Sequence, residues 1–231
     1  MKDPYLYENS DCLINKANLK DKVKLEEFEN RMTKVALVSI FKSEIKINNS
    51  QDIFIIHKTL FQNVFEWAGK PRTIDIYKNE PVLGGMSGEY SPYYKIINDL
   101  ESIDKKYFNQ EWKALKKEDF IHLFTKMIAS IWQVHAFREG NTRTISAFAF
   151  LFLKQQGYSY NAEFIKDKAR YFRTASVMAS LNKHSEYNYL QNILSDAVNI
   201  NLVENTNKYS KIKEYNVDSY KYQYHKVKDE Q

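Results

Sequence analysis

The residues best suited to chemistry lie within nine positions of the chain, from His135 to Arg143. A neutral imidazole such as that of His135 can take a proton from an attacking group. The carboxylate of Glu139 can hold a divalent cation that bridges phosphate oxygens. Together with an anion-binding group, a base and a metal-binding carboxylate are the parts of a phosphoryl or nucleotidyl transfer site.

The anion-binding group is provided by the start of a predicted helix. Gly140 permits a sharp backbone turn or the close approach of another group. Asn141, Thr142 and Arg143 follow it and are predicted to form the first helical turn. A helix start offers N–H groups without intrahelical acceptors and the positive end of the helix dipole, and both favour phosphate. The guanidinium of Arg143 adds a fork of donors at the same place.

Each of these residues also has a simpler interpretation. A single histidine beside an apolar helix, such as His135, is more often a packed or capping residue than a catalyst. Glu139 can be an ordinary acid near a helix start, and Asn141 can be an ordinary N-cap. These interpretations do not explain why the three residues occur together with Arg143.

Two apolar segments flank this polar stretch and must position it. Upstream, residues 119–134 carry large apolar side chains at helical spacing, namely Phe120, Leu123, Phe124, Met127, Ile128, Ile131 and Trp132. Downstream, Ile145 and the nearly unbroken apolar run 147–153 end before Gly157, which suits a helix C-cap. A helix that is apolar all round must be buried, and this one is too short to span a bilayer. The pattern predicts a helix, a polar loop and a second helix in the core.

The polar stretch resembles the motif of the Fic family, H-x-F-x-[D/E]-G-N-[G/K]-R-x-x-R. Six positions match, and they are His135, Phe137, Glu139, Gly140, Asn141 and Arg143. Two positions depart, because Thr142 stands where Gly or Lys is usual and Ser146 where a second Arg is expected. Residues 65–76 are similar to the region that leads into the family's β-hairpin flap, and residues 5–29 to the N-terminal part of many Fic proteins. The resemblance therefore extends from residue 5 to about 200.

This resemblance implies a mainly α, Fic-fold helical bundle with a small β-hairpin flap over the active site. We expect a Fic domain with an N-terminal extension in residues 1–204, followed by a Lys- and Tyr-rich tail in residues 205–231. Thr73–Tyr77 alternates polar and apolar residues, which favours a strand, and Val82–Leu83 is expected to return as a second strand. The flap, residues 73–83, is expected to hold a target protein by strand addition.

The resemblance also implies an activity, the transfer of AMP from ATP to a Tyr, Ser or Thr hydroxyl of a target protein. His135 would be the catalytic base and Glu139 the ligand of Mg²⁺. The other nucleotide contacts would come from Gly140, Asn141, Thr142, Arg143, Lys78 and Asn79. Because the neutral imidazole is the working form, activity is expected to fall as the pH drops through about 6.5.

The two departures from the motif leave alternatives open. In the family the second Arg contacts the γ phosphate, and Ser146 is too short and uncharged to replace it. The lost contact corresponds to roughly 1.5–3 kcal/mol, or one to two orders of magnitude in ATP affinity. Thr142 either narrows the cradle or adds a hydroxyl donor. One alternative is a Fic protein with another phosphate-linked donor, as in kinase-like relatives. The other is a degenerate Fic domain that binds a partner or nucleotide without catalysis.

Many Fic proteins are restrained by a helix that carries [S/T]-x-x-x-E-[G/N]. In this chain Glu29-Asn30 has Leu25 four residues before the acid, and Glu204-Asn205 has Ile200. Neither fits, so we expect no inhibitory helix of that type. Control is expected instead from a separate antitoxin chain, or from delivery into another cell as a bacterial toxin or effector.

Composition bounds the class of protein. The 231 residues are 43% hydrophobic and 15% aromatic, which excludes a disordered chain. The single Cys12 excludes an intrachain disulfide and fits the reducing cytoplasm. No N-terminal apolar segment predicts a signal or a membrane anchor. The tail carries acids among its lysines, so nucleic-acid binding is not expected.

Further helices are predicted over residues 21–46, 50–67, 91–108, 161–180 and 187–203. In the first, a buried face is predicted from Leu25, Phe28, Met32, Val35, Ala36, Ser39 and Ile40, with Glu29 among the solvated acids opposite. Ser50 is the expected N-cap of the second helix, and His57 within it is expected to be structural. Ile97 is predicted to lie inside the third.

Overall fold

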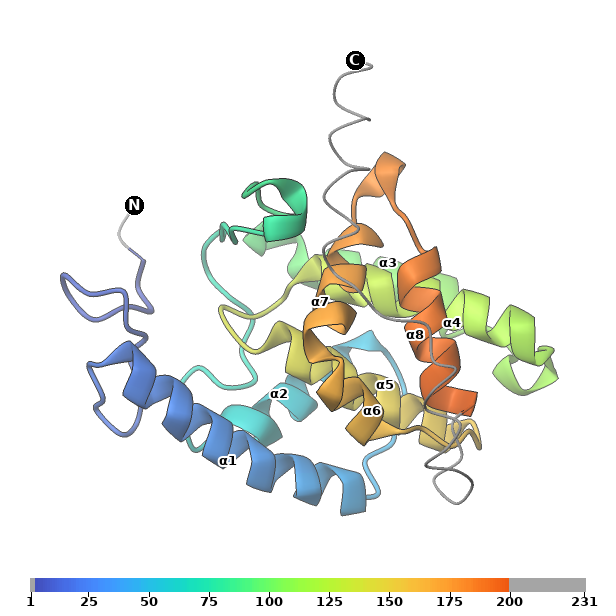
Figure 1. Ribbon diagram of the computed structural model, residues 1–231, viewed down its shortest axis with the longest axis horizontal. Helices are drawn as coiled ribbons and strands as arrows, with labels where there is room; N and C mark the ends of the chain where they lie inside the picture. The colour runs from blue at the N-terminus through green and yellow to red at the C-terminus, as the bar shows by residue number, and fades with distance from the viewer. Residues whose placement is uncertain (1–2, 200–231) are drawn as a thin grey trace. The chain divides into compact units, whose positions relative to one another are not determined.

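The computed structural model of the protein describes residues 3–199. In that part of the chain it contains eight α-helices and short 3₁₀ turns (Figure 1). The helices are α1 Lys22–Lys42, α2 Ile53–Phe61, α3 Ile96–Tyr107, α4 Lys117–Val134, α5 Asn141–Gln155, α6 Ala162–Asp167, α7 Ala169–Met178 and α8 Asn188–Asn199. The mainly α fold class predicted from the sequence is therefore confirmed.

The chain divides into two compact units. The first combines Met1–Asp75, Ser91–Asn109 and Val134–Gln155, and the second combines Ile76–Tyr90, Gln110–Gln133 and Gln156–Gln231. The helical segments that flank the polar stretch thus belong to different units, since the body of α4 lies in the second and α5 in the first. The stretch itself lies in the first unit.

In the first unit, α1, α2 and α5 pack against one another and enclose an aromatic core. Phe61 and Phe148 are fully buried within it. Polar side chains close its edges, because Gln155 at the end of α5 bonds both backbone groups of Ile47. The hydroxyl of Ser50 donates to the carbonyl of Leu100 on α3. These bonds tie the segment before α2 to the C-terminal end of α5 and to the middle of α3.

In the second unit, α6, α7 and α8 pack together. The hydroxyl of Ser180, just after α7, donates to the carbonyl of Ala129 on α4. Phe120 of α4 packs against Trp112 and Tyr158, with ring centroids 5.3 and 4.3 Å apart. These contacts hold α4 within the second unit.

The predicted buried face of α1 is partly wrong. The buried residues are Leu25, Glu29, Thr33 and Ile40, whereas Val35 is 69% exposed. The inward stripe is rotated from the predicted one because it includes a carboxylate and a hydroxyl. Such polar residues are buried only when specific partners lie opposite them, and a pattern of hydrophobicity cannot reveal those partners.

The predicted β-hairpin is also wrong. Residues 73–80 form no strand, because Thr73 and Ile74 lie in a bend and residues 75–80 have no regular secondary structure, and Val82 and Leu83 belong to a 3₁₀ turn, Pro81–Leu83. The segment still alternates in exposure, with Thr73, Asp75 and Tyr77 exposed. The alternation in exposure was predicted correctly, but a strand needs a partner at ladder distance. Val82 and Leu83 lie in the 3₁₀ turn instead, and the chain comes back beside Glu80 only afterwards, where the amide of Glu80 donates to the carbonyl of Met86 at 3.1 Å without a strand assignment.

Smaller differences concern helix ends. Asn49, not Ser50, is the N-cap that precedes α2, and it forms a capping box with Asp52. Ile97 is 38% exposed and not interior. The helix expected over residues 161–180 breaks at Lys168 into α6 and α7. The expected tail, residues 205–231, lies outside the described residues. Within residues 3–199 no helix has the length and apolar character that crossing a bilayer requires.

Truncation of two side chains on α1 tests its observed orientation. We expect Ile40→Ala to lower the free energy of unfolding by about 2–5 kcal/mol, since Ile40 is fully buried. Val35→Ala should change it by less than about 0.5 kcal/mol, because Val35 is exposed. Denaturant unfolding of both variants measures these values. If Val35→Ala lowered the free energy of unfolding as much as Ile40→Ala, the buried face predicted from the sequence would be correct.

Candidate active site

The polar stretch forms a tight loop between α4 and α5, as the sequence predicted. Helix α4 ends at Val134 and α5 begins at Asn141. His135 follows the last helical residue with a φ of +49°, in the left-handed region that non-glycine residues rarely adopt. Its side chain is buried, with 4% of the residue exposed. A left-handed residue just past a helix end is usually Gly, so a histidine there is an exception that invites a functional explanation.

Gly140 closes the loop at the start of α5. It has a φ of +83°, and a Cβ atom there would lie 2.4 Å from Cζ of Phe61. Its carbonyl accepts from both the amide and the hydroxyl of Thr144, at 3.0 and 2.9 Å. The glycine is therefore required twice, by backbone conformation and by the ring that packs against it.

Asn141 clamps the loop onto itself. Its Oδ1 accepts from the amide of Phe137 at 2.9 Å, and its Nδ2 donates to the carbonyl of Phe137 at 2.7 Å. Both ends of the side-chain amide are thus used on one residue, and Asn141 is 5% exposed. The asparagine fixes the turn that leads from His135 to the helix start, which is a role beyond the N-cap considered from the sequence.

Arg143 points from the first turn of α5 toward α1. Its Nη2 forms an ion pair with Oε1 of Glu29, and its Nη1 lies 3.4 Å from Oγ1 of Thr33. The guanidinium also lies over the ring of Phe61, 4.9 Å from the centroid. The candidate phosphate-binding cation is therefore already paired with a carboxylate.

Glu29 is a residue that the sequence argument set aside. It is 7% exposed, and its burial raises the pKa of its carboxyl group, while Arg143 acts in the opposite direction. The available signal was the helical spacing of Leu25, Glu29 and Thr33, which places the acid on the inward side. That signal is weak, because acids at this spacing usually face water.

His57 supports the loop from α2. Its Nδ1 lies 2.8 Å from the amide of Gly69, which can only donate, so Nδ1 accepts and the ring proton sits on Nε2. Nε2 then donates to the carbonyl of Glu139 at 3.1 Å. The ring stacks on Phe137, with centroids 3.8 Å apart. Burial lowers the pKa of His57 to about 3, so the neutral ring is part of the fold.

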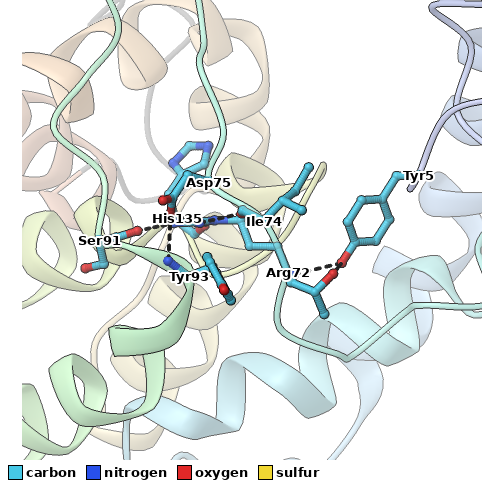
Figure 2. A network of polar contacts seen from close by, with 8 residues as sticks. Tyr5, Arg72, Ile74, Asp75, Ser91, Tyr93 and His135 are labelled. Atoms are coloured by element: carbon cyan, nitrogen blue, oxygen red, sulfur yellow. Dashed lines mark hydrogen bonds and ion pairs between the residues drawn. The ribbon is translucent and has the colours of Figure 1, made fainter. Parts of the chain in front are cut away.

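Arg72 is the second residue that sequence reasoning missed, and Figure 2 shows its contacts. Its side chain is fully buried, and Nε donates to the carbonyl of His135 at 2.9 Å. Nη1 donates to the carbonyl of Ile74, Nη2 to that of Ser91, and the backbone amide to that of Ala136. A lone arginine between a Pro and a strand-like segment gave no sequence signal of burial.

The N-terminal segment also holds the loop. Arg138 bonds Oδ2 of Asp3 through Nε and Nη2, at 2.9 and 2.8 Å. The hydroxyl of Tyr5 accepts from the amide of Thr73 at 3.0 Å. Because these contacts join the first residues of the chain to the loop, the N-terminal extension is part of the first unit and not an appendage.

The remaining predicted nucleotide residues lie in the second unit. The amide of Lys78 donates to the hydroxyl of Ser87 at 3.2 Å, and the side chain of Asn79 faces Gly85. Beside them, the buried carboxylate of Glu80 accepts from Nη2 of Arg173 at 2.6 Å. The structure thus brings His135, Glu139, Gly140, Asn141, Thr142 and Arg143 together in one loop and helix start. Lys78 and Asn79 belong to a separate unit, and their nucleotide contact stays a prediction.

The loop offers one carboxylate for a metal. Oε1 of Glu139 accepts from the amide of Gly140 at 3.1 Å, so the group sits at the helix start. Within the described part of the chain, His, Cys, Asp and Glu side chains form no group of three or more that could hold a metal ion. Mg²⁺ commonly binds through one or two carboxylates together with substrate phosphates and water. The donor set therefore fits magnesium delivered with a nucleotide and not a cation held by protein alone.

Comparison with known proteins agrees with this geometry. A model of the Fic/DOC family matches residues 47–153, which include α2, the segment 73–80, α3, α4, the loop and most of α5. The chain carries a Fic domain. The polar loop, which resembles the Fic motif and is called the Fic loop below, lies within the matched residues together with α4 and most of α5.

Relatives of known name share this Fic domain. The chain is 27% identical over 158 residues to protein adenylyltransferase VbhT of Bartonella schoenbuchensis, a match that covers 68% of this chain and 32% of VbhT. It is 25% identical over 168 residues to the probable protein adenylyltransferase Fic of Escherichia coli, covering 73% and 80%. Among solved structures it resembles BepC of Bartonella tribocorum with bound AMPPNP, with a TM-score of 0.70 and 22% identity. That likeness covers 84% of this chain and 95% of BepC.

A matched pair of glycine substitutions tests the close contact in the Fic loop. Gly140 and Gly157 have nearly equal φ values, +83° and +85°, but only Gly140 has a neighbour within 4 Å of a built Cβ atom. We expect Gly157→Ala to cost about 1–2 kcal/mol of stability through backbone strain alone. Gly140→Ala should cost a further 1–3 kcal/mol or so through the collision with Phe61. Equal losses in denaturant unfolding would show that the ring yields.

The buried His57 predicts a pH dependence of stability. Its pKa is about 3 in the folded protein against 6.5 for the free side chain, so the unfolded chain binds the extra proton between these values. Stability from this residue is complete above pH 6.5 and is lost as the pH falls, by up to about 1.4 kcal/mol per pH unit. His57→Gln should remove that slope between pH 6.5 and 5, and the exposed His122→Gln should retain it. A variant slope equal to that of the parent protein would contradict this assignment.

Proposed function

We propose that the protein transfers AMP from ATP to a Tyr, Ser or Thr hydroxyl of a target protein. The observation that carries this proposal is the geometry of one loop in a Fic domain. The loop puts a buried histidine at the end of α4 and a glycine-led helix start, with an arginine in its first turn, six residues later. Base and anion cradle are thus on opposite ends of the same tight turn.

The choice of donor is supported by the relatives. VbhT is a protein adenylyltransferase by name and the Escherichia coli protein a probable one. BepC, which shares the fold, binds AMPPNP. Since VbhT is about three times as long as the part that matches, its whole-protein activity is carried over here only as a proposal for the Fic domain.

The proposed chemistry needs one proton acceptor. The imidazole of His135 takes the proton from the target hydroxyl as its oxygen attacks the α phosphorus of ATP. The bond between the α phosphorus and the bridging oxygen breaks, and pyrophosphate leaves with the negative charge. The products are a phosphodiester between AMP and the target side chain, a protonated imidazole and pyrophosphate.

Charge on the phosphates is met by the start of α5. The amides of Asn141, Thr142 and Arg143 occupy the first turn, where no intrahelical acceptor exists. Arg143 contributes its guanidinium once it shares or exchanges its ion pair with Glu29. Asn141 acts through the turn that it clamps, because both ends of its amide bond Phe137.

Glu139 would hold Mg²⁺ together with the phosphates. When bound there, the ion would neutralise charge on the phosphate oxygens and orient them for displacement. The side chain itself already lies at the helix start, where its Oε1 meets the amide of Gly140. A single carboxylate next to an anion-binding helix start suits a Mg²⁺ ion that arrives bound to the nucleotide phosphates.

The target would be held along residues 73–83. Alternate side chains of residues 73–77 are exposed, and the target would bind along this segment by strand addition through main-chain hydrogen bonds. Such recognition makes little demand on target side chains. The proposed location is the cytoplasm. The proposed control is either a separate antitoxin chain or delivery into another cell as an effector.

Two features favour a second candidate, a Fic domain that binds nucleotide or a partner without catalysis. Arg143 is paired with a buried carboxylate, and Ser146 stands where the motif expects a second arginine. Both features weaken the grip on the ATP phosphates. A donor other than ATP, or kinase-like transfer of the γ phosphate, would follow from the same weakness.

Label transfer separates these functions. The protein is incubated with Mg²⁺, a cell lysate and ATP labelled on either the α or the γ phosphate. We expect α label on protein, reduced about 10²–10⁴-fold by His135→Ala. His122→Ala is the control, because His122 is an exposed histidine on α4, the helix that ends just before His135. Transfer of the γ label would indicate a kinase, and no transfer of either label would favour the binding domain.

The ion pair with Glu29 gives the same assay a second arm. Glu29→Gln leaves Arg143 with a neutral partner, so its charge is released toward phosphate. We expect a lower KM for ATP in the variant, with His135 still required. An unchanged KM would mean that Arg143 does not contact the nucleotide.

A further inference from the structure

We infer that Arg72 is the positioning residue of the site, which holds His135 in its left-handed backbone conformation and thereby aims the imidazole. The inference rests on the proposed function for its consequence in catalysis, but not for its structural part. It starts from the burial of a full charge. The Arg72 side chain is 0% exposed, and an arginine in such a place is costly unless its donors are satisfied.

The donors of Arg72 reach three separate segments of the first unit. Nε bonds the carbonyl of His135 at 2.9 Å, and Nη1 bonds that of Ile74 at 2.8 Å. Nη2 bonds the carbonyl of Ser91. The planar guanidinium keeps these directions fixed relative to one another. Figure 2 shows the Arg72 side chain with dashed lines to its partners among His135, Ile74, Asp75 and Ser91.

A carboxylate completes the group. Oδ1 of Asp75 lies 3.3 Å from Nη1 of Arg72 and also accepts from the amide of Tyr93 at 2.8 Å. The positive charge is therefore balanced next to the carbonyls, and the start of the helical segment after Ser91 is tied to the same point. Arg72 therefore links the Fic loop, residues 74–75 and the helical turn that begins at Tyr93.

Two consecutive carbonyls of the loop depend on Arg72. Its side chain takes that of His135, and its backbone amide takes that of Ala136 at 2.8 Å. Carbonyls at the end of a helix have no intrahelical partner. The carbonyls of His135 and Ala136 come directly after α4 and find their partner in Arg72. Fixing both of them fixes the peptide between His135 and Ala136, which sets the ψ angle of His135.

The contact between Arg72 and the carbonyl of His135 matters because the backbone of His135 is strained. A φ of +49° is unfavourable for a histidine, and such conformations persist only where surrounding structure imposes them. Side-chain rotamers depend on the backbone angles. If the peptide relaxes, the imidazole turns with it, and a displacement of about 1 Å can lower a rate about 10²-fold.

The test is Arg72→Lys, which keeps the charge and removes the fork. The full chain carries ¹³C-labelled histidine, and the His135 signal is assigned by its loss in His135→Gln. We expect the His135 signal and its titration midpoint to move in Arg72→Lys while those of His122 stay. We also expect kcat to fall about 10²-fold with KM for ATP near its parent value. Arg31→Lys is the control for the loss of a guanidinium, since Arg31 is an exposed arginine on α1.

A stability cycle keeps the inference testable if Arg72→Lys folds poorly. Glycine adopts a positive φ unaided, so His135→Gly removes the need for an imposed conformation. The loss of melting temperature on Arg72→Lys should then be smaller in the His135→Gly background. Equal losses in both backgrounds, failure of both variants to fold, or an unmoved His135 signal with unchanged kcat would overturn the inference.

The two proposals fail in different ways. A parent protein that transfers no AMP, combined with a His135 signal that responds to Arg72→Lys, would refute the proposed function and support the positioning role. Active parent protein with a kcat that Arg72→Lys does not change would do the reverse.

Discussion

The first unit depends on one tight turn, which leads from the end of α4 to the start of α5 and has left-handed backbone at both ends. His135 and Gly140 carry φ values of +49° and +83°. Only the second is a residue that adopts such a conformation at little cost. Three side chains therefore hold the turn by hydrogen bonds to its backbone. Asn141 bonds Phe137, His57 bonds the carbonyl of Glu139, and Arg72 bonds the carbonyl of His135. These three contacts fix the position of His135 relative to the start of α5.

Buried charge is concentrated around this turn. Arg72 and Glu29 are 2% and 7% exposed, and each has partners that compensate its burial. A core built for stability alone would place apolar residues there, since buried ion pairs are often no more stable than apolar replacements. The charges instead fix directions. Arg72 fixes the direction of backbone carbonyls, and Glu29 holds Arg143 over the ring of Phe61.

The ion pair between Glu29 and Arg143 shows how a motif is read differently with and without its surroundings. In the sequence, Arg143 is a donor fork beside a helix start, and Glu29 is one of several acids on a charged helix. In the structure, they are partners across α5 and α1. The capacity of the site to bind an anion is therefore set by an equilibrium between two acceptors for the same guanidinium, the carboxylate and the phosphate.

Much of the fold and part of the candidate site followed from the sequence. The apolar periodicity of residues 119–134 and 145–153, with Gly157 beyond, located α4, the loop and α5, because burial imposes a helical period on the residues that face the core. The resemblance of the loop to the Fic motif assigned the domain that the family comparison then showed. His135, Glu139, Gly140, Asn141 and Arg143 were found because their chemistry is local to a few consecutive residues.

The tertiary structure alone decided what depends on partners distant in the chain. The alternation of residues 73–77 described a segment with two faces, but whether it pairs as a strand depends on where residues 81–83 go, and they turn into a 3₁₀ helix. The inward direction of Glu29, the burial of Arg72 and the neutral state of His57 each require a group more than ten residues away. Sequence patterns record the environment of a helix face or a turn. They do not record which carbonyl or cation lies across from it.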